Sequence, residues 1–167
     1  MSLLIAAVGA TIAAIVESSV LTQLLIAGIK PDLVLAMTIA IVILLGFEQG
    51  MTWALVGGLL LDLLSPDRAI GATTLAMLLS AGAALLLARI ADYPGSLLIG
   101  VITIVLTFFY QGTLMLLLAL TTGTEMQPLN APAFAAIGIV NALFAIATAA
   151  TIRAWGRRFG RVDRLTW

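Results

Sequence analysis

The sequence predicts an all-α membrane protein, a polytopic bundle of six transmembrane helices. The chain of 167 residues is 62% hydrophobic and only 10% charged, whereas soluble domains carry about 25% charged residues. Its mean hydropathy is +1.20. Its apolar runs are continuous and do not alternate with a period of two residues. Continuous runs of this kind are typical of membrane helices and not of the strands of a β-barrel.

Six apolar segments follow one another along the chain. Because a span needs about 20 residues, the second and third segments are short. Only "EQG" separates these two, so we expect a tight helical hairpin whose helix ends extend into the turn. The alternative is a five-span chain in which one short segment is re-entrant. The segments cover approximately Leu3–Ile26, Leu33–Phe47, Met51–Leu64, Thr73–Ile90, Ser96–Leu120 and Pro132–Ala154.

The connections between the segments are short and leave no room for a soluble domain. They combine proline or glycine with a charged residue, which is the composition expected between helices. No Lys or Arg precedes the first segment, which is longer than the apolar core of a cleaved signal, so we expect it to be the first span. The predicted organisation is a transmembrane domain over residues 1–154 and a basic cytoplasmic tail over 155–167.

The positions of Lys and Arg predict the orientation. Positive charges collect on the cytoplasmic side of membrane proteins, and the end of this chain is rich in arginine, so we expect a cytoplasmic C-terminus. With six spans the N-terminus is cytoplasmic too, Arg89 lies inside, and only Lys30 and Arg68 lie outside. We expect Trp53, Trp155 and Trp167 at the inner interface, as in an aromatic belt. The arginines of the tail are Arg153, Arg157, Arg158, Arg161 and Arg164.

Asp62 is an ionisable residue inside a leucine-rich run. Gly50, Ala54, Gly58 and Asp62 recur every four residues, so they share one slowly drifting helix face. Small residues at this spacing let another helix approach closely, which indicates that Asp62 faces protein. One interpretation is an ion, proton or substrate site. The favoured one is a structural carboxylate that accepts hydrogen bonds from "SPDRAIG" or the next helix, or pairs with Arg68.

Glu17 is a second acid within a predicted span. We expect it at the outer interface, or hydrogen-bonded by Ser18 and Ser19, with a function shared with Asp62 as the alternative.

Two amides, Gln111 and Asn141, also lie within predicted spans. We expect them to form hydrogen bonds between helices, each worth about 0.6 kcal/mol. Gly138, Ala142 and Ala145 form a small-residue stripe beside Asn141. This stripe predicts a close helix contact, either inside the protein or with a partner.

The tail "RAWGRRFGRVDRLTW" has an amphipathic pattern. Trp155, Phe159 and Val162 have the spacing i, i+4, i+7, and arginines such as Arg157, Arg158 and Arg161 occupy the other face. This pattern predicts a segment that rests on anionic lipid as a topology anchor. Docking of a cytoplasmic partner is the alternative.

Enzyme motifs are absent from the sequence. The chain has no cysteine and no histidine, which excludes disulfides and Cys/His metal sites. It has no Gly-x-Ser-x-Gly, HExxH or P-loop. Asp62 and Asp67 flank a Ser-Pro turn and are poorly placed to share a water as a protease dyad. We therefore expect a non-enzymatic protein without catalytic, cofactor or metal residues.

The stretch from Lys30 to Gly82 resembles MreD, the rod-shape-determining membrane protein family of bacteria. The resemblance rests on "KPDLVLAMTIAIVILLG" followed by "GMTWALVGGLLLDLLSPDRAIGATTLAMLLSAG". Length, predicted span number and the basic C-terminus also fit, while the rest of the chain matches only in hydropathy. The matching positions are Pro31, Asp32, Gly58, Leu59, Asp62, Leu63 and Gly71.

This resemblance implies a component of the cell-elongation machinery in the bacterial inner membrane. Such proteins bind MreC, a periplasmic scaffold with one span, and help organise MreB filaments and the peptidoglycan synthases RodA and PBP2. MreD is also similar in architecture to the S components of energy-coupling-factor transporters, so a vitamin-binding transporter subunit is the alternative. Helix faces rich in Gly and Ala favour the assembly protein. A solute site on the outer side could use only Asp62, Glu17, Lys30 and Arg68.

Overall fold

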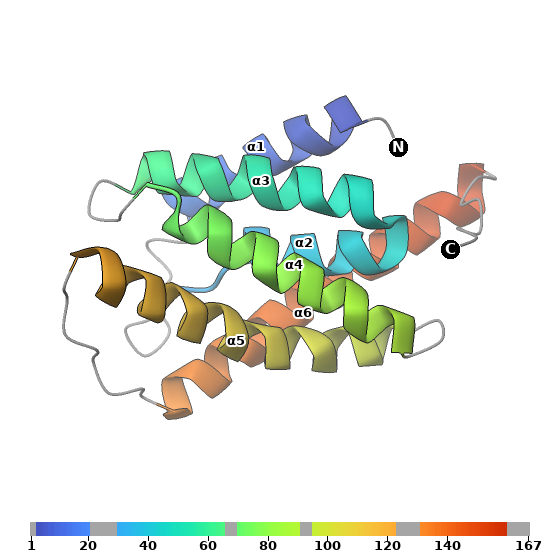
Figure 1. Ribbon diagram of the computed structural model, residues 1–167. Coiled ribbons are helices and arrows are strands. Elements are labelled where there is room, and N and C mark those ends of the chain that lie inside the picture. The colour runs from blue at the N-terminus through green and yellow to red at the C-terminus, as the bar shows by residue number, and fades with distance from the viewer. Residues whose placement is uncertain (1–2, 21–29, 66–69, 91–94, 123–130, 160–167) are drawn as a thin grey trace.

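The computed structural model describes residues 3–20, 30–65, 70–90, 95–122 and 131–159 (Figure 1). In these ranges the chain is helical, with short connecting residues, so the all-α prediction is confirmed. The six helices are α1 (Leu3–Ser19), α2 (Leu33–Leu45), α3 (Phe47–Leu64), α4 (Ala72–Ile90), α5 (Ser96–Thr122) and α6 (Ala131–Phe159).

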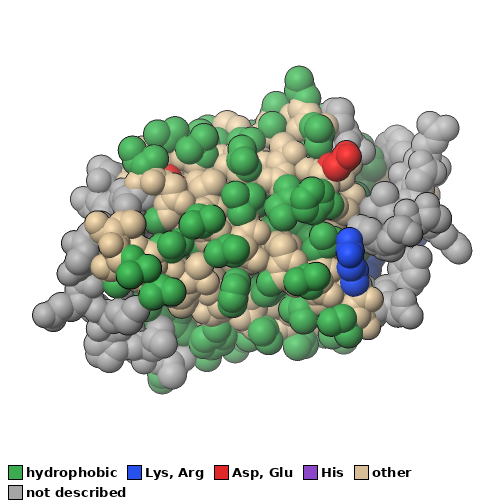
Figure 2. Space-filling model, in the orientation of Figure 1, with side chains coloured by type: hydrophobic (Ala, Val, Ile, Leu, Met, Phe, Trp, Pro, Cys, Tyr) green, Lys and Arg blue, Asp and Glu red, His purple; other side chains and the backbone are tan. Residues whose placement is uncertain are grey.

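Among the described residues, α4, α5 and α6 are long and apolar enough to cross a membrane, and α1 and α2 are shorter apolar helices. By helix length and hydropathy the chain is a multi-pass membrane protein. The outer surface agrees with this, because large hydrophobic side chains are exposed on the outer helices and extend along the whole face that Figure 2 shows. Soluble monomers rarely expose apolar patches beyond a few hundred Å².

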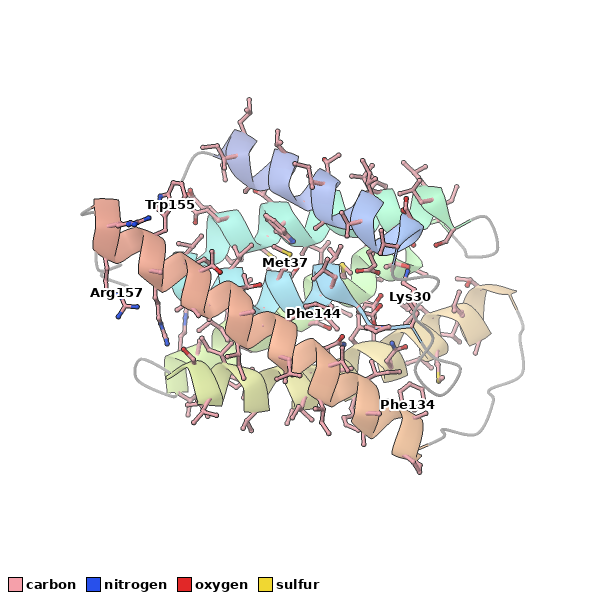
Figure 3. All side chains as sticks on the ribbon, turned by 180° about the vertical axis from the view of Figure 1, so that it is seen from behind. Lys30, Met37, Phe134, Phe144, Trp155 and Arg157 are labelled. Atoms are coloured by element: carbon pink, nitrogen blue, oxygen red, sulfur yellow. The ribbon has the colours of Figure 1, made fainter. Side chains whose placement is uncertain are left out.

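The shortest helix, α2, occupies the centre of the bundle (Figure 1). It contacts all the other helices, and α6 crosses it in the view of Figure 3. A helix that is apolar on every side is expected to be buried, and the residues from Val34 to Ile43, except Met37, are buried. Its 13 residues extend about 20 Å, which is shorter than the ~30 Å hydrocarbon core.

A single residue, Gly46, joins α2 to α3. Its φ of +94° lies in the left-handed region that glycine adopts without steric cost, so one residue can end α2 and begin α3. The predicted tight hairpin is therefore present, but its turn is not "EQG". Glu48, Gln49 and Gly50 belong to the first turn of α3, which makes the third helix longer than the predicted segment.

Both small-residue stripes pack inside the protein. A Cβ atom at Gly50 would collide with the side chain and backbone of Val42 in α2, and one at Gly58 would lie 2.7 Å from the Thr74 Cα in α4. A Cβ atom at Gly138 would lie 3.4 Å from Ile104 in α5. The two stripes therefore let helices of this chain approach one another.

Gly58→Ala is expected to destabilise the protein, because the added methyl group meets backbone atoms that can move only by separating α3 from α4. The expected loss is about 1–3 kcal/mol of the free energy of unfolding. Gly82→Ala is the matched control, since its Cβ atom meets nothing within 4 Å and alanine favours a helix by up to ~1 kcal/mol. The melting temperature in detergent measures both effects, and an equal change in the two variants would contradict this account.

One expectation about the tryptophans needs correction. Trp53 is not part of an aromatic belt, because it is only 4% exposed and its ring packs against Gly9 of α1. Trp155 is exposed, and Trp167 lies outside the described residues. Because α6 continues to Phe159, the expected boundary between residues 154 and 155 falls within a helix.

Candidate functional site: buried carboxylates at the helix junctions

Three carboxylates are buried in the same half of the bundle, namely those of Glu17, Asp32 and Asp62, which are 1%, 6% and 2% exposed. Glu17 lies near the end of α1, Asp32 directly before α2, and Asp62 near the end of α3. An isolated buried charge in a membrane is costly, so each of these groups needs partners that replace water.

Asp62 joins the end of α3 to the beginning of α4. Its Oδ1 accepts a hydrogen bond from the Thr73 amide at 3.0 Å. Its Oδ2 accepts from the amides of Gly71 and Thr74, each at 3.0 Å, and from the Thr74 hydroxyl at 2.7 Å. A carboxylate at this position satisfies amides that have no partner within the helix and also interacts favourably with the helix dipole. These are the bonds that the structural interpretation of Asp62 predicted.

Glycine is favoured at position 71 of this junction because of the backbone conformation there. Its φ of +96° is in the left-handed region, which favours glycine, and it turns the amide toward Asp62. Arg68, the other predicted partner of Asp62, lies outside the described residues.

Glu17 joins α1 to α2 in a similar way. Its Oε2 accepts a hydrogen bond from the Val34 amide in the first turn of α2 at 2.7 Å. Its Oε1 lies 3.3 Å from the Lys30 ammonium. The expected hydrogen bond from Ser18 is not formed, because Ser18 donates instead to the Ile15 carbonyl, and the Glu17 side chain is buried. The segment from Lys30 to Val34 supplies this cation and this amide, which the residues next to Glu17 in the sequence did not reveal.

Asp32 joins α2 to the last two helices. Its carboxylate Oδ2 accepts a hydrogen bond from Gln111 of α5 at 2.9 Å, and its backbone amide donates to Asn141 Oδ1 of α6 at 3.0 Å. Asn141 in turn donates to the Thr107 hydroxyl at 3.3 Å. Asn141 thus makes a hydrogen bond between α6 and α5, as expected. Gln111 bonds instead to Asp32, the residue that precedes α2, which is also a partner of Asn141.

This junction lies deep in the bundle. Asn141 is ten residues after Ala131, the first residue of α6, which is about 15 Å along the helix axis. Gln111 is at a similar depth, eleven residues before the end of α5. The N-terminus of α2 is therefore inside the protein and not at its outer surface.

The polar residues of α5 were only partly identified from the sequence. Thr103, Thr107 and Gln111 recur every four residues and so line one helix face. The two threonine side chains are buried and donate to the carbonyls of Ile99 and Thr103. The spacing of these three residues is a signal that could have located the face of α5 that meets Asp32.

The remaining predicted residues have simpler surroundings. Pro31 is buried before α2, whereas Leu59 and Leu63 are exposed on the outer face of α3. Arg157 and Arg158 are exposed at the end of α6, and Arg161 lies outside the described residues. In the part of the chain that the structure describes, no group of three or more acidic side chains could hold a metal ion.

The polar contacts of these three acidic residues connect the helices to one another. Glu17 and Asp62 each connect one helix to the next along the chain, and Asp32 connects α2 to α5 and α6.

A scan against protein-family models and searches of curated proteins and of solved structures found no match to this chain.

Proposed function

We propose that this chain is a non-enzymatic, MreD-like component of the bacterial cell-elongation machinery. The observation that carries the proposal is that most residues of the resemblance lie at helix junctions or helix contacts, while Leu59 and Leu63 are exposed. Asp62 and Gly71 connect α3 to α4, Gly58 allows the same two helices to approach, and Asp32 opens α2. Motif residues with these positions have the role expected of a scaffold, since they define how its helices pack.

In this proposal the protein spans the inner membrane six times, has the S-component-like architecture that the resemblance implies, and has both termini in the cytoplasm. It binds MreC and, through the wider complex, helps organise MreB filaments with RodA and PBP2. Its exposed apolar helix faces are available to a membrane helix of a partner. Small residues permit close contact between membrane helices, and those of α3 and α6 are already used internally, so the partner contact is expected on other faces.

A second candidate is a solute-binding subunit similar to the S components of transporters. The observation that favours it is the depth of the Asp32, Gln111 and Asn141 cluster. Polar groups inside a membrane protein often mark substrate pathways. A solute entering from the Lys30 side would meet this cluster at the beginning of α2.

Co-purification separates the two candidates. The protein is co-expressed with MreC from the same organism, solubilised and purified through a tag on MreC, with an unrelated single-span protein as the control bait. The assembly proposal expects a stable complex with MreC and none with the control. If MreC captures no protein while a vitamin raises the melting temperature of the isolated chain, the assembly proposal is wrong and the solute-binding candidate is favoured.

A further inference from the structure

The last helix projects beyond its neighbours at the end opposite to the carboxylates. Arg153 donates a hydrogen bond from Nη1 to the hydroxyl of Ser96, the first residue of α5. The Arg153 guanidinium is therefore level with the first residue of α5. The helix continues for six more residues to Phe159, about 9 Å along its axis, and Figure 1 shows this end of α6 beyond the ends of α4 and α5.

This projecting end carries most of the positive charge that the structure describes. Arg153 and Arg157 are four residues apart and share one helix face. Arg158 lies beside them, and Arg89 is in the last turn of α4, which packs against α5. Arg157 and Arg158 are exposed and form no ion pair within the described part of the chain. Figure 3 shows Arg157 and Trp155 at the end of the molecule far from Lys30.

The depth of these arginines matches the lipid headgroup region. Arg153 is 22 residues from the first residue of α6, about 33 Å, while the hydrocarbon core is about 30 Å thick. With Ala131 at the opposite hydrocarbon boundary, Arg153 lies about 3 Å beyond the near boundary and Arg157 and Arg158 lie about 9–10 Å beyond it. The long side chains of these arginines can reach back into the headgroup layer. Trp155 is 66% exposed beside them, as is usual for tryptophan at a membrane interface.

We propose that Arg153, Arg157 and Arg158 of α6 form a binding site for the phosphate groups of anionic phospholipids. The planar guanidinium binds two phosphate oxygens at once. The hydrogen bond to Ser96 fixes the position of Arg153, so less conformational freedom is lost when a headgroup binds. The exposed arginines and the tryptophan then hold the lipid on the outside of the bundle, in the leaflet on the side of the C-terminus.

The test is a titration of the purified full-length protein with phosphatidylglycerol or phosphatidylcholine in mixed micelles, with the melting temperature as the readout. The wild type is expected to be stabilised selectively by phosphatidylglycerol. In the double variant Arg157→Gln/Arg158→Gln, the midpoint of this titration is expected to rise at least tenfold, since each basic residue near an anionic surface contributes about fivefold to binding. Its melting temperature without added lipid is expected to equal that of the wild type.

Glu48→Gln is the matched control, because Glu48 is an exposed acid in the first turn of α3, and its loss makes the net charge more positive. This variant is expected to keep the phosphatidylglycerol midpoint or lower it. Equal stabilisation of the wild type by the two lipids overturns the proposal, as does an unchanged midpoint in the double arginine variant. Stabilisation by millimolar inorganic phosphate equal to that by phosphatidylglycerol also overturns it, since the site would then be one for soluble phosphate.

Discussion

Replacing Asp62 with leucine is expected to remove most of the folded protein. The carboxylate accepts four hydrogen bonds from Gly71, Thr73 and Thr74, and leucine would leave these buried or partly buried donors without this partner. A buried donor without a partner costs about 1–3 kcal/mol, so the total loss is about 4 kcal/mol, which is a large share of the stability of an ordinary domain. The yield of monodisperse protein in size-exclusion chromatography measures the result.

Asp62→Asn is expected to have an intermediate effect. An amide has one acceptor oxygen, which can stay with the donors of Gly71 and Thr74 while its NH₂ group faces the Thr73 amide. The variant should fold with a free energy of unfolding lower by about 1–3 kcal/mol and retain most of its complex formation. A normal yield of Asp62→Leu would contradict the structural role. A stable Asp62→Asn protein that has lost all function would instead indicate an ionic or protonic role.

Replacing Glu17 with leucine is expected to have the second large effect. It leaves the Lys30 ammonium and the Val34 amide without the carboxylate that both now contact. Because the Lys30 side chain is 23% exposed and can be partly hydrated, the expected loss lies between the ~1–3 kcal/mol of an unpaired buried amide and the ~3–5 kcal/mol of a fully buried ion pair that loses one partner. The free energy of unfolding in mixed detergent micelles, titrated with a denaturing detergent, measures this loss.

The double variant Glu17→Leu/Lys30→Met tests the ion pair separately from the hydrogen bond. If the main cost of the single variant is an uncompensated ammonium, the double variant is expected to be more stable than Glu17→Leu alone. Glu17→Gln should lose less than Glu17→Leu, because its amide oxygen can still accept from Val34. The single variant Lys30→Met completes the cycle. If the losses of stability in Glu17→Leu and Lys30→Met add up to the loss in the double variant, the 3.3 Å contact contributes no coupling energy.

The sequence predicted the fold class and the approximate course of the helices, because long apolar runs separated by proline, glycine and charge are a local signal. It also predicted that Asp62 would meet the next helix, since its partners follow within twelve residues. The contacts of Asp32 were not predictable in this way. Its partners Gln111 and Asn141 are 79 and 109 residues away, and only the packing of α5 and α6 around α2 brings them together.

The burial of Trp53 could not be predicted from the sequence for a different reason. Tryptophan near the end of a predicted span is typical of the membrane interface, and that general tendency supported the wrong expectation. What decides its burial is Gly9 on the neighbouring helix, which leaves room for the indole ring. No property of residues adjacent to Trp53 carries that information, because it depends on which face of α1 meets α3.

Each buried carboxylate has its partners in particular helices. The order in which those helices are made therefore sets an order of assembly during synthesis. Glu17 and Asp62 find their partners in the helix that follows them, so each can be neutralised or hydrogen-bonded as soon as that helix has entered the membrane. Asp32 shares two hydrogen bonds with α5 and α6, the last helices to be made. The first four helices are therefore incomplete as a unit, and the nascent chain keeps an unfinished polar contact at its centre until its C-terminal hairpin is inserted.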